Sequence, residues 1–342
     1  MRKLGWLGVF GVFVAVATYG GRPVAGQQQM PRPYGTPPPL AITAFGGKPV
    51  TYQAPRTPWG DPDLQGVWSN QTPVPLERPA ALANKPTFTE QEATEAEKNA
   101  LASALANVAG AIPTSGEFNE IWLESEKGRV HRNLSTSLVI DPPDGKIPYT
   151  TEGRARWEET PHLTTERITG RTLRADTWED RALQERCITS DTMFYANGFY
   201  NNYQQIVQAP GHVVILVESM HDTRVIPLDR RPHLGANVTQ WLGDSRGWWE
   251  GTTLVVETTN FNDKRRFHGA TRNMTLVERF TRVDDATIDY RLTVTDPETF
   301  TQPWTLETNL WRTDEAIYEV ACHEGNYGLA NILSGARAQE KE

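Results

Sequence analysis

Apolar and polar residues alternate along the chain from Tyr203 onwards, which is the pattern of half-buried β-strands. Between Thr287 and Thr295, for example, every second residue is apolar, and those between are Asp, Arg or Thr. Turn residues such as Gly, Pro and Asp separate these segments. The predicted strands are Tyr203–Ala209, His212–Ser219, Thr223–Leu228, the two arms of a hairpin within Trp241–Thr259, Met274–Val283, Thr287–Thr295, Trp304–Trp311 and Ile317–Cys322.

The hairpin at Trp241–Asn262 has the most distinctive sequence of these segments. Its two arms are rich in Trp and Val and meet at Glu250-Gly251, which we interpret as the turn. We expect its Trp residues to close the core. The rest of the hairpin is then mainly scaffold, and its candidate functional residues are Arg246 and the polar tip at Asn260.

Shorter elements precede and follow the alternating region. The Gly-x-Trp pattern at Gly66–Trp68 is typical of the first strand of a lipocalin-like barrel, although a Trp at a strand start also serves simply as core. Thr89 and Glu92 form a capping box, which begins a helix that extends to Gly110. The other predicted elements are two strands around a turn (Ser137–Ile140 and Lys146–Tyr149), short surface helices between Thr151 and Cys187, and a C-terminal helix over Leu329–Ala338.

The order of these elements indicates the fold class. About nine sequential antiparallel strands with short turns favour an up-and-down barrel or a strongly curled sheet, because closure removes exposed strand edges. We therefore predict a mainly β, lipocalin-like fold with a few peripheral helices. A sandwich of two sheets is the alternative.

The N-terminus predicts export. Arg2 and Lys3 precede a short apolar run, and small residues follow at Val24-Ala25-Gly26, as in a signal peptide at 1–26. A retained anchor is the alternative, but the run is short for a membrane span. Residues 27–60 are rich in Pro and Gln and predict an extended tail. The rest, 61–342, is expected to be one β-barrel-like domain with helical insertions around 89–110 and 151–187.

Charge and cysteine content narrow the partners and the compartment. Arg2, Lys3 and Arg22 fall within the leader, so the 34 Lys and Arg of the chain drop to 31 against 42 Asp and Glu, a formal charge of −11. Such an acidic protein is not expected to bind nucleic acid or, after cleavage, a membrane. Cys187 and Cys322 predict a disulfide in a periplasmic or extracellular protein, worth roughly 4–5 kcal/mol by loop entropy. Two buried free thiols are the alternative.

Several blocks of sequence resemble a widespread family of exported bacterial proteins of unassigned activity. The resemblance covers most of the chain after Asp61, and it implies no mechanism. Three positions depart from the expected pattern, with Thr252, Trp248 and Arg230 standing where we expect Asp, Arg and Gly. The matching blocks are Leu138–Gly145, Glu185–Cys187, His221-Asp222 with Arg224–Leu228, Arg246–Asn262, Glu278–Phe280, Asp296-Pro297 with Thr301 and Pro303-Trp304, and Ala321–Tyr327.

Two histidine-bearing segments are candidates for acid/base chemistry. In the turn at His221, the neighbouring Asp222 can orient an imidazole base, and Arg224 can hold an anionic oxygen. Asp222 in a turn also has the ordinary role of accepting backbone hydrogen bonds. The second segment places His323, Glu324 and Tyr327 directly after Cys322, where polar residues equally serve as caps of the following helix.

Glu278 is the third candidate. It shares a strand face with Leu276 and Phe280, which predicts partial burial, and a buried carboxylate either needs a partner such as Arg246 or has a raised pKa. A structural ion pair and a general acid inside a barrel are both compatible with this pattern. Arg246, Asn260, Glu278 and Tyr327 are the candidate substrate-binding residues.

The function classes that remain are three. Seven His without metal-ligand spacing, and the lack of phosphate-loop, dinucleotide and nucleophile-elbow motifs, predict no metal or other cofactor. Many Trp, Tyr and Phe suggest an aromatic-lined pocket for an apolar or carbohydrate-like small molecule. The first hypothesis is an exported cofactor-free enzyme: a lyase, isomerase or hydrolase. The alternatives are a non-catalytic lipocalin-like binding protein and a structural envelope protein.

Overall fold

The computed structural model describes residues 52–100, 102, 129–161, 174–190, 201–264 and 267–341. All of them belong to one compact unit of the chain, Ile42–Glu342. The expected signal peptide and residues 27–51 of the expected tail lie outside the described residues. No helix in the described ranges is long and apolar enough to cross a membrane.

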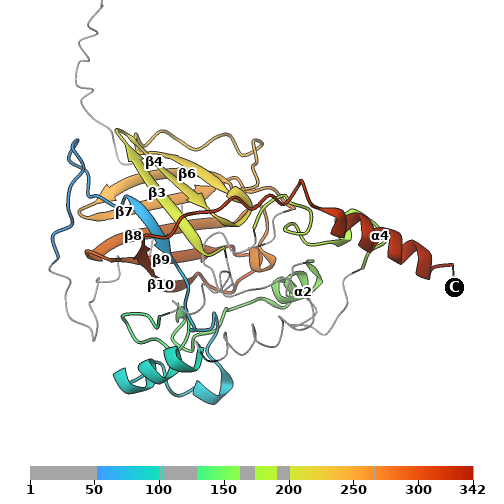
Figure 1. Ribbon diagram of the computed structural model, residues 1–342, viewed down its shortest axis with the longest axis horizontal. Coiled ribbons are helices and arrows are strands. Elements are labelled where there is room, and N and C mark those ends of the chain that lie inside the picture. The colour runs from blue at the N-terminus through green and yellow to red at the C-terminus, as the bar shows by residue number, and fades with distance from the viewer. Residues whose placement is uncertain are drawn as a thin grey trace, which may run out of the picture. The chain divides into compact units, whose positions relative to one another are not determined.

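A ten-stranded antiparallel sheet dominates the described structure (Figure 1). This confirms the predicted mainly β fold class. Its order is β5-β4-β3-β1-β10-β9-β8-β7-β6, and β2 pairs with β10 off this path. The strands are β1 Gly66–Ser69, β2 Val139–Asp141, β3 Tyr203–Ala209, β4 His212–Val217, β5 Thr223–Pro227, β6 Asp244–Glu250, β7 Thr253–Thr259, β8 Thr275–Asp284, β9 Thr287–Thr295 and β10 Trp304–Thr313.

Apart from β2, the strands form two up-and-down meanders that are joined into one sheet. Strands β3 to β5 form one antiparallel arm and strands β6 to β10 form the other, and β1 joins the two arms by pairing with both β10 and β3. The hydrogen-bonded path does not close, because its end strands β5 and β6 lie side by side without a ladder. The sheet is therefore strongly curled, with a seam between β5 and β6.

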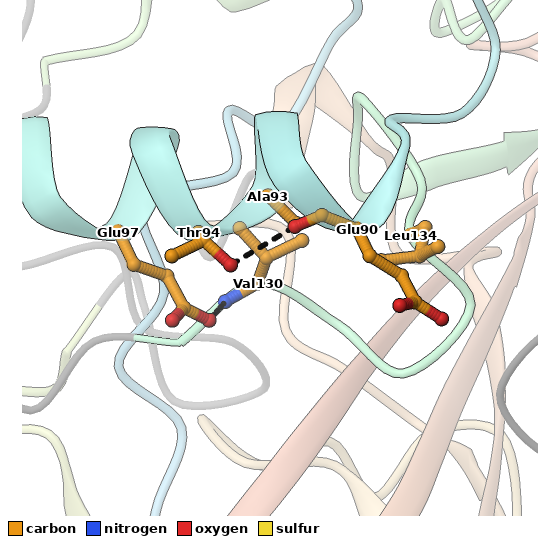
Figure 2. A pocket seen from close by; sticks show the side chains of 6 residues that line it. All are labelled: Glu90, Ala93, Thr94, Glu97, Val130 and Leu134. Atoms are coloured by element: carbon orange, nitrogen blue, oxygen red, sulfur yellow. Dashed lines mark hydrogen bonds between the residues drawn. The ribbon is translucent and has the colours of Figure 1, made fainter.

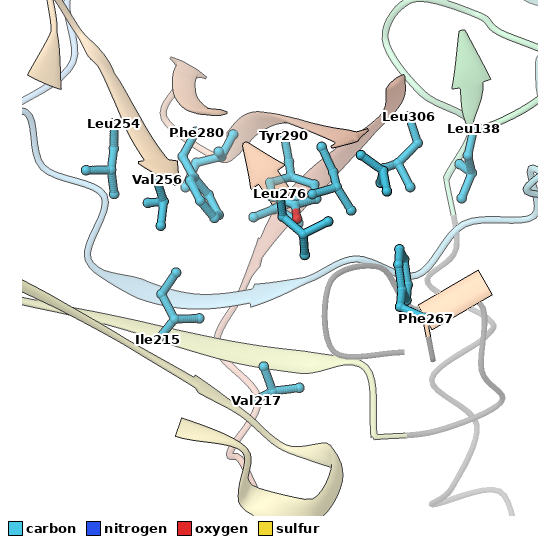
Figure 3. Close-up of a cluster of buried hydrophobic side chains, with 14 of the residues drawn as sticks. Leu138, Ile215, Val217, Leu254, Val256, Phe267, Leu276, Phe280, Tyr290 and Leu306 are labelled. Atoms are coloured by element: carbon cyan, nitrogen blue, oxygen red, sulfur yellow. The ribbon is translucent and has the colours of Figure 1, made fainter. Parts of the chain in front are cut away.

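The inward face of the curled sheet carries the core. Alternate residues of β7, β8 and β9, such as Leu254, Phe280 and Leu292, are fully or almost fully buried and belong to one apolar cluster. Ile215 and Val217 of β4 approach this cluster from the opposite side (Figure 3). The period-two alternation therefore places one apolar face of each arm toward the other.

Helices lie outside the sheet, as predicted. Thr89 and Glu92 exchange the two hydrogen bonds of a capping box, and the helix that follows spans residues 90–100. The chain further contains α2 Thr151–Glu159 and α4 Tyr327–Gln339. Residues 103–128 and 162–173, which include the rest of the predicted helix and part of the 151–187 insertion, lie outside the described residues.

Two predicted strands are wrong. Ile317–Cys322 forms no ladder, because the amides of Tyr318 and Val320 donate to side chains rather than to a neighbouring strand. Lys146–Tyr149 contributes only an isolated bridge between Tyr149 and Phe300.

Gly247 tests the close packing of the seam. A Cβ atom at Gly247 would lie 2.7 Å from Leu228 Cδ2 and 2.9 Å from Ile226 Cγ2. We expect Gly247→Ala to lower the free energy of unfolding by about 1–2 kcal/mol through overpacking. Gly335→Ala in α4, where no heavy atom lies within 4 Å, should instead be neutral or stabilising. Equal behaviour of the two variants in urea unfolding would contradict a packed seam.

Candidate functional site

The predicted catalytic residues occupy different environments. Arg224 is buried inside the curled sheet, whereas His323 and Glu324 are exposed in the segment before α4. Tyr327, a predicted binding residue, is 75% exposed at the start of α4. The structure therefore does not gather the predicted set into one cavity.

Arg224 and Glu278 form an ion pair across the interior. Arg224 extends inward from β5 and binds both carboxylate oxygens of Glu278 on β8, with 2.8 Å between Nη2 and Oε1. Tyr290 of β9 donates its hydroxyl to the same Oε1 at 3.0 Å. Burial, and then the Glu278 carboxylate, raise the pKa of Tyr290 well above its ordinary value. Glu278 is buried as expected, but its partner is Arg224 rather than Arg246.

Arg246 and Asn260 hold the loop before β6. Arg246 lies on the outer face of the sheet, where its guanidinium binds Asp244 at 2.6 Å and the carbonyl of Pro232. The Asn260 amide donates to the carbonyls of Leu234, Gly235 and Val238, each at 3.0 Å. His233 of this loop bridges two carboxylates, Asp244 at 2.9 Å and Glu257 at 3.1 Å. These contacts order a surface loop and do not reach the interior.

His221 and Asp222 occupy the turn between β4 and β5. Asp222 accepts hydrogen bonds from the Thr189 hydroxyl at 2.6 Å and the Ser190 amide at 2.9 Å. His221 Nε2 accepts from the Val320 amide at 3.1 Å. Both side chains therefore hold neighbouring segments onto the turn, which is the ordinary role that turn residues of this kind serve.

Cys187 and Cys322 form a disulfide with a Cα–Cα distance of 5.7 Å. It ties the segment before α4 to residues 182–190. Asn326 strengthens the same attachment, since its amide donates to the Glu185 carbonyl at 2.9 Å.

Sequence reasoning missed His131, which is 1% exposed. Its Nε2 lies 3.1 Å from Thr308 Oγ1, and Thr308 is on the inward face of β10. Burial lowers the pKa of His131 to about 3, so the imidazole is neutral. Its Nδ1 is buried and has no hydrogen-bond partner among the described residues.

Gln71 carries a second buried atom without a hydrogen-bond partner among the described residues, and it lies in a segment that contacts the one carrying His131. Its Oε1 is buried without a partner in the described part of the chain, and the residue is 6% exposed. The Arg129 amide donates to the Gln71 carbonyl at 3.4 Å, so the segment that carries His131 runs beside Gln71. Neither residue sits in a periodic pattern or a motif, so no sequence signal marked them.

A shallow depression lies on the outer side of the same segment (Figure 2). It has a volume of about 340 Å³, between the helix over 90–100 and residues 130–134. Val130 forms part of its lining, and the Val130 amide donates to Glu97 Oε1 at 2.8 Å. The remaining lining residues are Glu90, Ala93, Thr94, Glu97 and Leu134.

A polar network on the outer face also anchors this segment. Asn309 of β10 accepts from the Arg132 amide at 2.7 Å and donates to Asp289 of β9. Glu307 accepts from Asn133 at 2.7 Å and binds Arg291. Burial, and then the Glu307 carboxylate, raise the pKa of Asp289 to about 7.

No group of three or more His, Cys, Asp or Glu side chains in the described ranges is arranged to hold a metal ion.

Comparison with known proteins assigns no family. No protein-family model matches the chain, and no curated protein matches it. Among solved structures it is similar to a "secretary abundant heat soluble" (SAHS) protein from Ramazzottius varieornatus, at 13% identity over 32% of this chain and 70% of that chain. The TM-score is 0.22. A likeness this weak carries no argument, so the fold class rests on the sheet itself and the resemblance to exported bacterial proteins stays a prediction.

The ion pair can be tested by removing one or both of its charges. Glu278→Gln removes the carboxylate that binds the buried Arg224 guanidinium at two points, so we expect a loss of about 3–5 kcal/mol in the free energy of unfolding. The triple variant Arg224→Met, Glu278→Leu and Tyr290→Phe replaces all three polar groups and should recover most of it. A loss below about 1 kcal/mol for Glu278→Gln would contradict a desolvated pair.

The raised pKa of Asp289 should make the stability of the protein decrease as the pH rises. Its folded-state pKa of about 7 lies above the unfolded value of about 4. Between these two pH values the folded state still holds the proton that the unfolded state has lost, so the free energy of unfolding falls as the pH rises. The fall ends near pH 7, where the folded state also loses the proton. Asp289→Asn does not titrate, so its stability relative to wild type should increase over this range by on the order of 3 kcal/mol. Urea unfolding between pH 4.5 and 8.5 measures the difference. A difference between Asp289→Asn and wild type that stays constant over this range would contradict the shift.

Proposed function

We propose that the chain is an exported, non-catalytic binding protein for a small, neutral, hydroxyl-bearing molecule. The observation that carries this proposal is the pair of buried, unpaired polar atoms, His131 Nδ1 and Gln71 Oε1, in adjacent segments. A buried polar atom without a partner costs about 1–3 kcal/mol, and a bound molecule that supplies the missing hydrogen bond removes that cost.

The chemistry of the two atoms defines the ligand class. We assign the His131 proton to Nε2, where it donates to Thr308 Oγ1, because the Thr308 hydroxyl can in turn donate to the Asn309 carbonyl 3.5 Å away. Nδ1 is then an acceptor, as is Gln71 Oε1. Two acceptors favour a molecule with two hydroxyl donors, and a neutral histidine offers no charge for an anion. A carbohydrate or another polyol fits this requirement.

The positions of the predicted catalytic residues favour binding over catalysis. Arg224 is occupied by Glu278, and His221 and Asp222 accept hydrogen bonds from neighbouring segments. His323 and Glu324 are exposed in the segment before α4, whereas His131 and Gln71 are buried. Export rests on the N-terminal leader pattern and on the disulfide.

Gln71→Met separates ligand binding from ordinary packing. The change removes the unpaired acceptor with little change in volume, so the free protein should gain up to about 1 kcal/mol in stability. Affinity for a bound polyol should fall about tenfold, because one hydrogen bond is lost. Binding is measured by calorimetry and by the rise in Tm with glucose, trehalose and inositol, and glucuronate serves as the charged counterpart.

Gln205→Met is the matched control, since Gln205 lies on the outer face of β3. It should leave polyol binding unchanged. The proposal fails if no neutral polyol raises the Tm, or if Gln71→Met lowers stability without affecting binding. The second result would mean that the amide bonds an ordered water.

A further inference from the structure

The segment between β10 and α4 buries little of its surface against the rest of the fold. We call residues 314–326 the C-terminal strap. None of its residues is buried, and Tyr318 is 68% exposed. Little apolar burial therefore holds the strap in place, and its attachment depends on a few polar contacts and one covalent link.

Two of these contacts come from the turn between β4 and β5. The Tyr318 amide donates to Glu218 Oε1 at 3.0 Å, and the Val320 amide donates to His221 Nε2 at 3.1 Å. Glu218 is 2% exposed beneath the strap. The turn presents His221 with a φ of 53°, a conformation that few residues other than glycine adopt.

The hydrogen bond to Val320 defines the protonation state of His221. A backbone amide is always a donor, so Nε2 must be an acceptor and the imidazole must be neutral, with its proton on Nδ1. Protonation adds an N–H at Nε2, so both ring nitrogens then carry a hydrogen. Two donors, this N–H and the Val320 amide, then point at each other, and no hydrogen bond can form between them. Histidine is the side chain that undergoes this change in mildly acidic solution.

Charged residues of three segments stand close to this contact in the sequence or across the disulfide. Glu218 and Asp222 flank His221 in the turn, Glu319 precedes Val320 in the strap, and Glu185 and Arg186 precede Cys187 across the disulfide. Asp222 is held by Thr189 and Ser190, and Glu218 by the Tyr318 amide. The hydrogen bond from the Val320 amide is the contact of the strap that His221 accepts, and a proton on Nε2 removes that acceptor.

We propose that His221 is a pH-sensitive latch, whose protonation releases the middle of the C-terminal strap while the Cys187–Cys322 disulfide keeps its far end tethered. Release frees the Tyr318 and Val320 amides and uncovers Glu218 at the end of the sheet. Reduction adds a second step: dithiothreitol gives two electrons to the disulfide and closes to its own cyclic disulfide, and the two cysteines take up two protons as thiols. The strap and α4 are then free to leave together.

Hydrogen exchange of the strap peptide tests the latch. Protection of the Tyr318 and Val320 amides, corrected for the intrinsic rate at each pH, should fall about five- to tenfold between pH 7.5 and 5.5 in the oxidised full-length protein. Dithiothreitol at pH 7.5 should lower the hydrogen-exchange protection of residues 322–326, which the disulfide holds in place. Protection that does not change with pH would overturn the proposal.

Three variants assign the effect to His221. His221→Gln keeps an acceptor near the position of Nε2 but does not titrate, so protection should stay high at both pH values. His221→Phe removes the acceptor, so protection should be low at both. His323→Gln, in the exposed part of the same strap, should behave as wild type. A pH dependence that persists in His221→Gln would assign the change to another group and contradict the latch.

Discussion

The described structure depends on one buried ion pair that crosses the interior of the curled sheet. Arg224 lies on β5, an end strand of the hydrogen-bonded path, and Glu278 lies on β8 in the opposite arm. Burying two charges is tolerated only when their geometry is satisfied, here by two contacts between them and a third from Tyr290. Because β5 and β6 share no ladder, this pair is the polar contact that fixes β5 against the opposite arm.

Regular alternation made most of the sheet predictable. Glu278 was expected to be buried because it shares a strand face with Leu276 and Phe280, and the structure confirms this. Its partner was not predictable, because which strands face each other across the interior depends on the curl and not on local sequence. The same limit applies to Ile317–Cys322, where alternation resembles a strand but the amides bond Glu218 and His221.

The groups that carry the functional proposals lie in irregular segments supported by this sheet. His131 and Gln71 are positioned by the inward face of β10 and by the end of β1, and His221 by the turn between β4 and β5. Such segments have no periodicity, so their burial could not be read from the sequence. Placement of specificity on loops supported by a rigid sheet is common among β-proteins.

A crystal structure of the natively purified protein tests the central functional claim most directly. The density of interest lies within hydrogen-bond distance of both His131 Nδ1 and Gln71 Oε1. We expect a bound molecule that donates hydroxyl hydrogens to both atoms, retained from the source or introduced by soaking with a polyol. Direct pairing of both atoms with protein groups, or a single water that no polyol displaces, would contradict it.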